Sequence, residues 1–351
     1  MACINSTADY AELKRLLTQA GVFRPQLVYY GLQALLVLAI FVLGFGLLFV
    51  ADAFWMRLLI AGLLTLGYVR VAYIIHDAGH RQLFGQPRQN DIAMLVGGFF
   101  VGTSRSWWFE THNQHHANAN DPDRDPNMAL PVLAFTDEQA RSRRSIFRIA
   151  SRYQAYYFYG LLFLEGLGVR VASAQFLLSG RAKYTLIEAS TIAAHLVLYG
   201  AVVLATMPLA QAVAFMLVHQ CLTGFYMGFV FAPNHKGMPI LDRTLGYDFF
   251  QSQVLSCRNI HPSPITDFAY GYLNYQIGHH LFPMIPRNRL GVARLILRDY
   301  CAQHAATYHE TSIWQSYVEV TRYFNDVVAP LRGPAERPLA YAASPDSRPL
   351  D

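Results

Sequence analysis

Residues 28–50 read VYYGLQALLVLAIFVLGFGLLFV, 23 residues without a charge in which Gln33 is the only strongly polar side chain. About 20 consecutive apolar residues suffice to cross the hydrocarbon core of a bilayer as a helix. A second apolar stretch, residues 54–75, follows after only Ala51-Asp52-Ala53. A connector this short joins two helices as a hairpin, so the pattern predicts an integral membrane protein of the all-α class.

The same pattern recurs downstream in residues 186–207 and 210–232, which are separated by Pro208-Leu209. We therefore expect four membrane crossings in two helical hairpins. Arg57 and Arg70 lie near the two ends of residues 54–75, where long side chains can extend to the lipid headgroups. The composition agrees: 53% of the 351 residues are hydrophobic, 15% are charged, and the mean hydropathy is +0.21.

The basic residues predict the orientation in the membrane. The two hairpin tips contain no Lys or Arg, and 26 of the 28 basic residues, all but Arg57 and Arg70, belong to the opposite side. By the positive-inside rule that side is cytoplasmic. The membrane is expected to be a bacterial inner membrane, or the endoplasmic reticulum in a eukaryote. The net charge of +5 is assigned to contact with anionic membrane lipids and not to nucleic acid.

We expect one membrane domain, residues 28–329, flanked by a cytosolic segment 1–27 and a flexible, proline-rich tail 330–351. The first 27 residues lack the short apolar core of a removable signal peptide. The parts between and after the hairpins, residues 76–185 and 233–329, are predicted to be cytosolic. Within the second part, residues 287–328 have the spacing of cap helices.

The long segment between the hairpins contains three further patterns. Residues 92–103 are apolar but too short to cross, so they should lie at the interface or dip in from one side. The aromatic residues of 153–168 suit either the headgroup layer or a buried core. Asp121, Asp123 and Asp125 lack the glycine and final glutamate of a calcium loop. They predict a solvated turn in which one aspartate can orient a ligand imidazole.

Histidine is the residue type that indicates chemistry. Eight of the 13 histidines form three clusters and one single site: His76, His80, His112, His115, His116, His235, His279 and His280. Within the first two clusters the spacings are three and four residues, which align side chains on one helix face, and Gln276-His279-His280 repeats the geometry. Eight imidazoles exceed what one zinc ion uses, so two metal ions are implied.

Imidazole ligands suit iron, copper and zinc alike, so the ligand type does not name the metal. A neutral, nitrogen-rich site at a membrane face favours a pair of irons that activates O2. An HExxH sequence is absent, which argues against a zinc protease. His195 and His219 lie inside apolar segments and are interpreted as packing residues. His261, His304 and His309 are also left out of the ligand set.

HDAGH at 76–80, HNQHH at 112–116, FAPNHKGMP at 231–239 and NYQIGHHLFP at 274–283 together resemble the membrane fatty acid desaturase family. The similarity is greatest to its bacterial and front-end-like branch and spans residues 76–286, with 286–323 also similar. The resemblance implies two iron ions bound by the eight clustered histidines, His235 included. It places Asn234 and Gln276 in the surrounding shell.

The resemblance also implies the reaction, which is the O2-dependent removal of two hydrogens from a fatty acyl chain carried as acyl-CoA, acyl-carrier protein or acyl-lipid. Electrons are expected from a separate ferredoxin, cytochrome b5 or NAD(P)H-dependent reductase, because the chain has no HPGG haem motif. This branch usually carries Glu before the final two histidines, whereas this chain has Gly278. Iron binding should survive this difference, because position 278 points away from the ligand stripe.

Several alternatives remain open from the sequence. A hydroxylase or acetylenase would use the same scaffold. A metal transporter would place its ligands near the bilayer midplane, and a zinc-dependent lipid hydrolase would need neither O2 nor a reductant. The aromatic residues Trp107, Trp108, Tyr226 and Phe229 suit either the wall of an acyl channel or ordinary packing.

Overall fold

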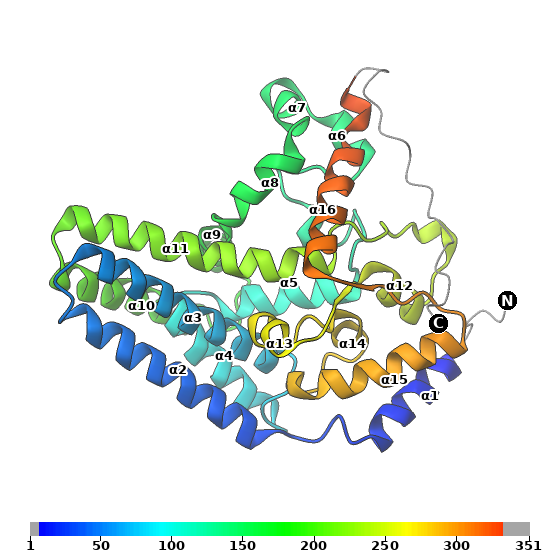
Figure 1. Cartoon of the computed structure of the whole chain (residues 1–351), viewed down its shortest axis with the longest axis horizontal. Coiled ribbons are helices and arrows are strands. Elements are labelled where there is room, and N and C mark those ends of the chain that lie inside the picture. The colour runs from blue at the N-terminus through cyan, green and yellow to red at the C-terminus, as the bar shows by residue number, and fades with distance from the viewer. Residues whose placement is uncertain (1–6, 333–351) are drawn as a thin grey trace.

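The computed structural model describes residues 7–332 and is almost entirely helical (Figure 1). The long helices are α2 (Leu27–Leu48), α3 (Phe54–Gly79), α10 (Thr185–Thr206) and α11 (Leu209–Phe231). The shorter helices are α1 (Thr7–Gln19), α4 (Pro87–Val101), α5 (Arg105–Ala117), α6 (Asp137–Ser142), α7 (Ser145–Ser151), α8 (Gln154–Leu162), α9 (Glu165–Leu178), α12 (Phe249–Ser256), α13 (Pro264–Tyr270), α14 (Gln276–Leu281), α15 (Leu290–Gln303) and α16 (Ile313–Val327). Five 3-10 turns are η1 (Pro126–Met128), η2 (Ala232–Asn234), η3 (Arg243–Leu245), η4 (Arg287–Arg289) and η5 (Ala329–Leu331), and strands β1 (Asn259–Ile260) and β2 (Glu310–Thr311) form one short parallel pair.

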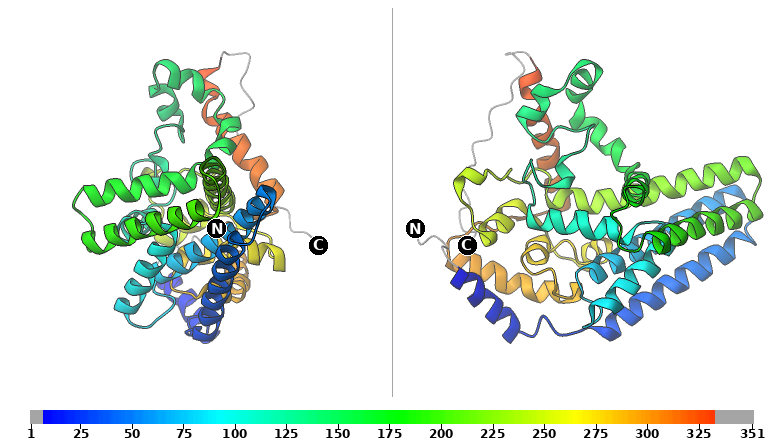
Figure 2. Two further views of the ribbon diagram at one scale, coloured as in Figure 1. Left: turned by 90° about the vertical axis from the view of Figure 1, so that its left-hand side faces the viewer. Right: turned by 180° about the vertical axis from the view of Figure 1, so that it is seen from behind.

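The four long helices confirm the predicted membrane spans. They run side by side with the two hairpin tips at one end and the shorter helices at the other (Figures 1 and 2). All four are long and apolar enough to cross a bilayer. Their outward faces expose large apolar side chains such as Leu35, Val42 and Leu198, as expected for helices in contact with lipid. Helix α3 lies at the centre of the bundle and packs against α2, α4 and α11.

The two arginines within α3 behave differently from each other. Arg57 lies near the hairpin tips, where it donates to the Ala51 carbonyl and to the Gln211 side chain of α11. The prediction that Arg70 extends to the headgroups is wrong. Its side chain is buried, donates to the carbonyl of Phe268 and lies over the Phe268 ring. The reason is that α3 continues to Gly79 and α13 covers it, so position 70 is not near the helix end.

Residues 92–101 form the second half of α4, and Gly102 and Thr103 follow it as a turn. Whether this helix lies at the membrane interface or dips in from one side stays a prediction. Helix α4 packs along α3 and α10, and the chain turns at Gly102, which has a positive φ of 70°. A Cβ at Gly102 would lie 2.7 Å from the ring of His195, in the middle of α10. Helix α5 begins three residues later and returns toward the histidine clusters.

The aromatic stretch 153–168 is buried in part and exposed in part, and its place in the headgroup layer stays a prediction. Helices α8 and α9 are bent by 74° at a short break. Phe158 is buried and packs against Phe324 of α16, whereas Tyr153 and Tyr156 are exposed. The stretch therefore contributes to a buried core on one side and to the surface on the other.

The remaining helices form the predicted cap at the end of the bundle opposite the hairpin tips (Figure 1). Helix α1 packs on α15 through Leu13 and Leu17, which are fully buried. Pro330 and Leu331, which the sequence assigned to the tail, belong to η5, and Leu331 is buried. The rest of the predicted tail, residues 333–351, lies outside the described residues. The division into one domain, residues 28–329, with a cytosolic segment before it, stays a prediction.

Candidate metal centre

The eight clustered histidines come from four separate elements. His76 lies in the last turn of α3, and His80 is its C-terminal cap residue. His112, His115 and His116 lie on α5, His235 follows η2 directly after α11, and His279 and His280 lie on α14. His76 is 22 residues beyond the start of α3, which is about 33 Å of helix. Since the hydrocarbon core is about 30 Å thick, this histidine lies just past the edge of the membrane.

The orientation of α5 is fixed at its N-terminus. Ser104 caps the helix by accepting a hydrogen bond from Trp107 N. The buried carboxylate of Glu188, from α10, accepts from the hydroxyls of Ser104 and Ser106 and from Ser106 N. A carboxylate at this end of a helix is stabilised by the helix dipole and by free backbone N–H groups. Helix α5 is therefore attached directly to a membrane helix.

Helix α14 is attached to the cap. Asn259 of β1 accepts a hydrogen bond from Ile277 N through its side-chain oxygen, and Ile277 is fully buried. Gly278 faces α15, where an added Cβ would lie 3.1 Å from Leu297. Position 278 therefore points away from the histidines, as the spacing indicated. His279 and His280 project to the other side, toward α3 and α5.

The eight imidazoles converge in two adjoining groups. One group contains His76, His80, His112, His116 and His279, and the other contains His115, His235 and His280. Within each group one ring nitrogen from every residue lies within 4.8 Å of all the others. The Nε2 atoms of His80 and His112 are 3.0 Å apart, and those of His115 and His235 are 3.2 Å apart. Two nitrogens that bind one metal ion at about 2.1 Å and at right angles lie about 3.0 Å apart, so these separations suit shared coordination.

The electrostatics favour neutral imidazoles, the form that binds metal. Burial, together with the neighbouring imidazoles, lowers the pKa of six histidines well below the ordinary value: His80, His112, His116, His235, His279 and His280. A neutral ring keeps a lone pair free for coordination at neutral pH.

Two carboxylates that belong to neither histidine group contact imidazole rings of the groups and orient them. His76 Nδ1 lies 3.1 Å from Asp77, whose other oxygen forms a 3.0 Å ion pair with Arg287. Asp77 and Arg287 are both fully buried. Burial alone would lower the pKa of Arg287, but the Asp77 charge and the nearby tyrosines raise it. His115 Nδ1 lies 3.0 Å from both oxygens of Asp125.

Asp125 departs from the predicted solvated turn. Its carboxylate is buried and also accepts hydrogen bonds from the backbone N–H groups of Asn120 and Asn127. Burial would raise its pKa, but the hydrogen bond with His115 and the nearby positive charges lower it to about 2. Only Asp123, of the three aspartates, is exposed. The expectation that one aspartate orients a ligand imidazole fits this geometry.

The second group is held by amides and carbonyls. His235 Nδ1 lies 3.0 Å from the Ser256 carbonyl, and His280 Nδ1 lies 2.9 Å from Gln253 Oε1. Gln276 Nε2 is 2.9 Å from His235 Nε2, and Asn234 donates to Gln276 Oε1. Gln276 thus contacts the histidines directly, whereas Asn234 acts through Gln276. Their place in the shell around a metal ion stays a prediction.

Trp108 closes the first group on the side of α5. Its ring stacks on His112 with centroids 4.2 Å apart and packs edge-on against His76 and His80. A Cβ at Gly79 would lie 1.9 Å from this ring, so only glycine fits there. The other proposed channel residues have packing contacts: Tyr226 donates to the Ala269 carbonyl, and Phe229 stacks on Tyr317. The acyl channel itself stays a prediction.

The five histidines left out of the ligand set lie elsewhere. His219 bonds the Tyr199 hydroxyl and His195 stacks on the Tyr199 ring, both within the membrane helices. His304 bonds the Tyr300 carbonyl, and His309 pairs with Glu319. His261 is exposed. None of the five joins either group within residues 7–332.

The residues present fit two metal ions. Both ring nitrogens of His279 and the Nε2 of His280 are buried without a hydrogen-bond partner among the described residues. Leaving a buried polar atom unpaired costs about 1–3 kcal/mol, and coordination of one nitrogen of each ring to a metal ion removes this cost for that nitrogen. An all-imidazole set with carboxylate and amide support is also a common donor set for transition metals.

Sequence reasoning missed several of the supporting residues. Asp77 lies inside the HDAGH motif, so its position beside His76 was a usable signal. Arg287, Gln253 and Glu188 belong to no motif, and their contacts arise only when distant segments pack together. No spacing in the sequence identifies them.

Comparisons with known proteins identify the family of the chain. The family model for fatty acid desaturases matches residues 53–312. The chain is 27% identical to an acyl-lipid (9-3)-desaturase of Physcomitrium patens, covering 91% of this chain and 62% of the moss protein. It is 28% identical to a Delta(8)-fatty-acid desaturase of Helianthus annuus (95% of this chain, 77% of the relative) and 29% identical to a Delta(6)-fatty-acid desaturase of Caenorhabditis elegans (88% and 72%). The chain thus spans less than two thirds of the moss relative. With four apolar helices ending at a histidine centre, the chain belongs to the fatty acid desaturase family and is an oxidoreductase of fatty acyl chains.

Proposed function

We propose that this chain inserts a double bond into a membrane-delivered fatty acyl chain, using two iron ions held by the eight clustered histidines. The observation that carries the proposal is the convergence of eight buried or half-buried imidazoles at the end of four lipid-facing helices. His76, His80, His112, His116 and His279 would hold one ion. His115, His235 and His280 would hold the other, with Gln276 beside them.

Bound as a pair, the irons supply the activation of O2. The overall reaction removes two hydrogens from adjacent carbons and, with two electrons and two protons from the donor, reduces O2 to two waters. The protein's own residues fix the ligands. Asp77, Asp125, Ser256 and Gln253 each bond a ring Nδ1 and so leave Nε2 free to face the centre. Trp108 and the apolar packing limit water near the ligands.

We further propose that the centre faces the cytosol and that a separate protein supplies the electrons. The excess of Lys and Arg on the side opposite the hairpin tips supports this orientation. A membrane-impermeant thiol reagent tests it in intact cells. Asp52→Cys, at a hairpin tip, should react from outside, and Gln303→Cys, at the end of α15, should react only after lysis. The reverse pattern would refute the orientation.

Product analysis tests the activity. The chain is expressed in a host with defined lipids, and new double bonds are located by mass spectrometry. A hydroxylated product in place of an alkene would refute desaturation. His115→Ala should lose iron and activity while still inserting in the membrane, and His304→Ala, a cap histidine outside both groups, is the matched control. Full iron content in the His115 variant would contradict the ligand assignment.

A further inference from the structure

A projecting limb, defined here as residues 137–162 of helices α6, α7 and α8, has no role in the metal centre. Viewed from the hairpin tips it extends beyond the outline of the four long helices (Figure 2, left). Along the helix axes it lies beside the last turns of α11, at the end opposite the tips (Figure 1). Helix α8 packs on α16, and that contact attaches the limb to the cap. The limb is therefore at the depth where the bilayer surface meets the cap.

The central part of the limb contains basic residues and no acidic residue. Between Glu138 and Glu165 there are five arginines and no acidic residue: Arg141, Arg143, Arg144, Arg148 and Arg152. Arg143 is half-buried and donates to the Leu133 carbonyl. The other four are exposed, and their side chains have no hydrogen-bond or ion-pair partner within residues 7–332. Four unpaired cations in twelve residues form a strongly positive surface.

Large apolar side chains accompany these arginines. Ile146, Phe147, Ile149, Tyr153 and Tyr156 are 66, 55, 56, 61 and 67% exposed. Within α7, Arg148 lies opposite the face that holds Ile146, Phe147 and Ile149, and Arg144 and Arg152 flank the helix at its two ends. Helical geometry therefore separates a basic side from an apolar stripe. Such a segment binds a membrane surface by burying its apolar stripe below the headgroups.

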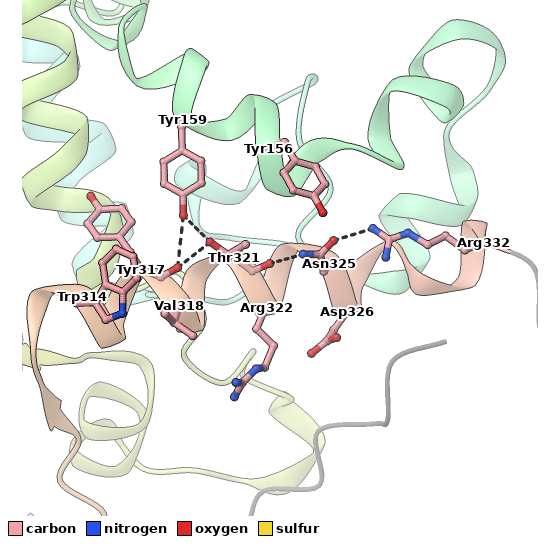
Figure 3. A pocket seen from close by; sticks show the side chains of 10 residues that line it. All are labelled: Tyr156, Tyr159, Trp314, Tyr317, Val318, Thr321, Arg322, Asn325, Asp326 and Arg332. Atoms are coloured by element: carbon pink, nitrogen blue, oxygen red, sulfur yellow. Dashed lines mark hydrogen bonds between the residues drawn. The ribbon is translucent and has the colours of Figure 1, made fainter. Parts of the chain in front are cut away.

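A shallow cavity of about 570 Å³ continues this surface between α8 and α16 (Figure 3). Its lining includes Tyr156, Tyr159, Trp314, Arg322 and Arg332. Aromatic rings with nearby guanidinium groups are the side chains that gather at the headgroup layer of a bilayer.

We propose that the limb is a docking surface for anionic phospholipids, in which the four exposed arginines contact headgroup phosphates and the apolar stripe enters the leaflet. An acidic soluble protein would match the charge alone. Binding of such a protein would not explain the exposed isoleucines and tyrosines that lie beside the arginines at the depth of the bilayer surface. Lipid satisfies both features at once.

The test measures the position of the limb by spin labelling of the full chain. A nitroxide is attached at Phe147→Cys after Cys3 and Cys221 are replaced by Ser, since Cys257 and Cys301 are fully buried and do not react. The protein is placed in nanodiscs of phosphatidylcholine alone or with phosphatidylglycerol. The accessibility of the label to O2 and to a water-soluble nickel chelate reports its depth. A label at Gln303→Cys, on the exposed end of α15, is the control for a site outside the bilayer.

We expect the label at 147 to enter the bilayer when phosphatidylglycerol is present, and the label at 303 to stay in water. Each arginine near an anionic surface increases binding about fivefold, so Arg144→Gln with Arg148→Gln should lower the ratio of buried to water-exposed label about 25-fold. Lys14→Gln with Arg298→Gln removes the same charge from α1 and α15 and should have no effect.

A label at 147 that stays in water in both lipids would overturn the proposal. So would equal effects of the two double variants, or burial of the label only after an acidic donor protein is added. The readout needs no catalysis, so it is independent of the proposed reaction.

Discussion

Replacing Arg287 by Gln should destabilise the protein and weaken iron binding together. Arg287 and Asp77 are both fully buried and form an ion pair of 3.0 Å, and Arg287 also donates to the Tyr29 hydroxyl of α2. Removal of one partner leaves the Asp77 charge buried without compensation, which costs about 3–5 kcal/mol. Since Asp77 also orients His76, the loss of its partner should weaken iron binding by about 10- to 100-fold.

Two assays follow these effects. Unfolding by SDS in detergent micelles, monitored by circular dichroism, gives the free energy of unfolding of the apoprotein. Iron titration followed by elemental analysis gives the affinity. The double variant with Asp77→Asn and Arg287→Gln should recover part of the lost stability, because no isolated charge remains. Arg298→Gln, an exposed arginine on α15, is the control. A loss below about 1 kcal/mol for Arg287→Gln, or a double variant less stable than the single one, would refute the reasoning.

Three further predictions concern the same centre. Gly79→Ala should lower iron content and stability, because its Cβ would lie 1.9 Å from Trp108. Elemental analysis and a thermal melt measure the two effects. The control is Gly62→Ala, whose Cβ would have no atom within 4 Å. Asp125→Asn should weaken iron binding about 10- to 100-fold, because it removes the carboxylate that contacts His115. Asp123→Asn, in the same loop, should leave the iron affinity unchanged. Equal iron affinities in the two variants would contradict the role of Asp125 in orienting His115. Apoprotein stability should be constant above about pH 6.5 and fall as the pH drops below it, because histidines with a lowered folded pKa take up protons more readily when unfolded. A melting temperature that rises between pH 7.5 and pH 5.5 would contradict that sign.

The sequence was most informative where short-range periodicity controls the structure. Residues 28–50 and their three counterparts became α2, α3, α10 and α11 because lipid requires every backbone group to be paired within its own helix. The spacing of His112, His115 and His116 placed them on one part of α5 for the same local reason. These patterns identified the membrane fold and selected eight histidines that lie together in two groups.

Contacts between distant segments were beyond the reach of such patterns. Asp125 was assigned to a solvated turn because its neighbours are polar and rich in proline, yet packing against His115 buried it. Arg70 was placed at a membrane edge because the apolar stretch ends at residue 75, whereas α3 continues through the first histidine cluster. In both cases burial depends on which segments pack together, and that information is absent from local composition.

Helix α3 has no break between the hairpin tip and His76. It therefore behaves as one rigid rod of about 39 Å, with one end seated in lipid and the other in the ligand set. A helix of this kind adjusts to a thinner or thicker bilayer by tilting as a whole. Because α3 has no hinge that could absorb such a tilt, the imidazole rings of His76 and His80 at its far end move with it. A change in bilayer thickness therefore changes the geometry of the metal centre.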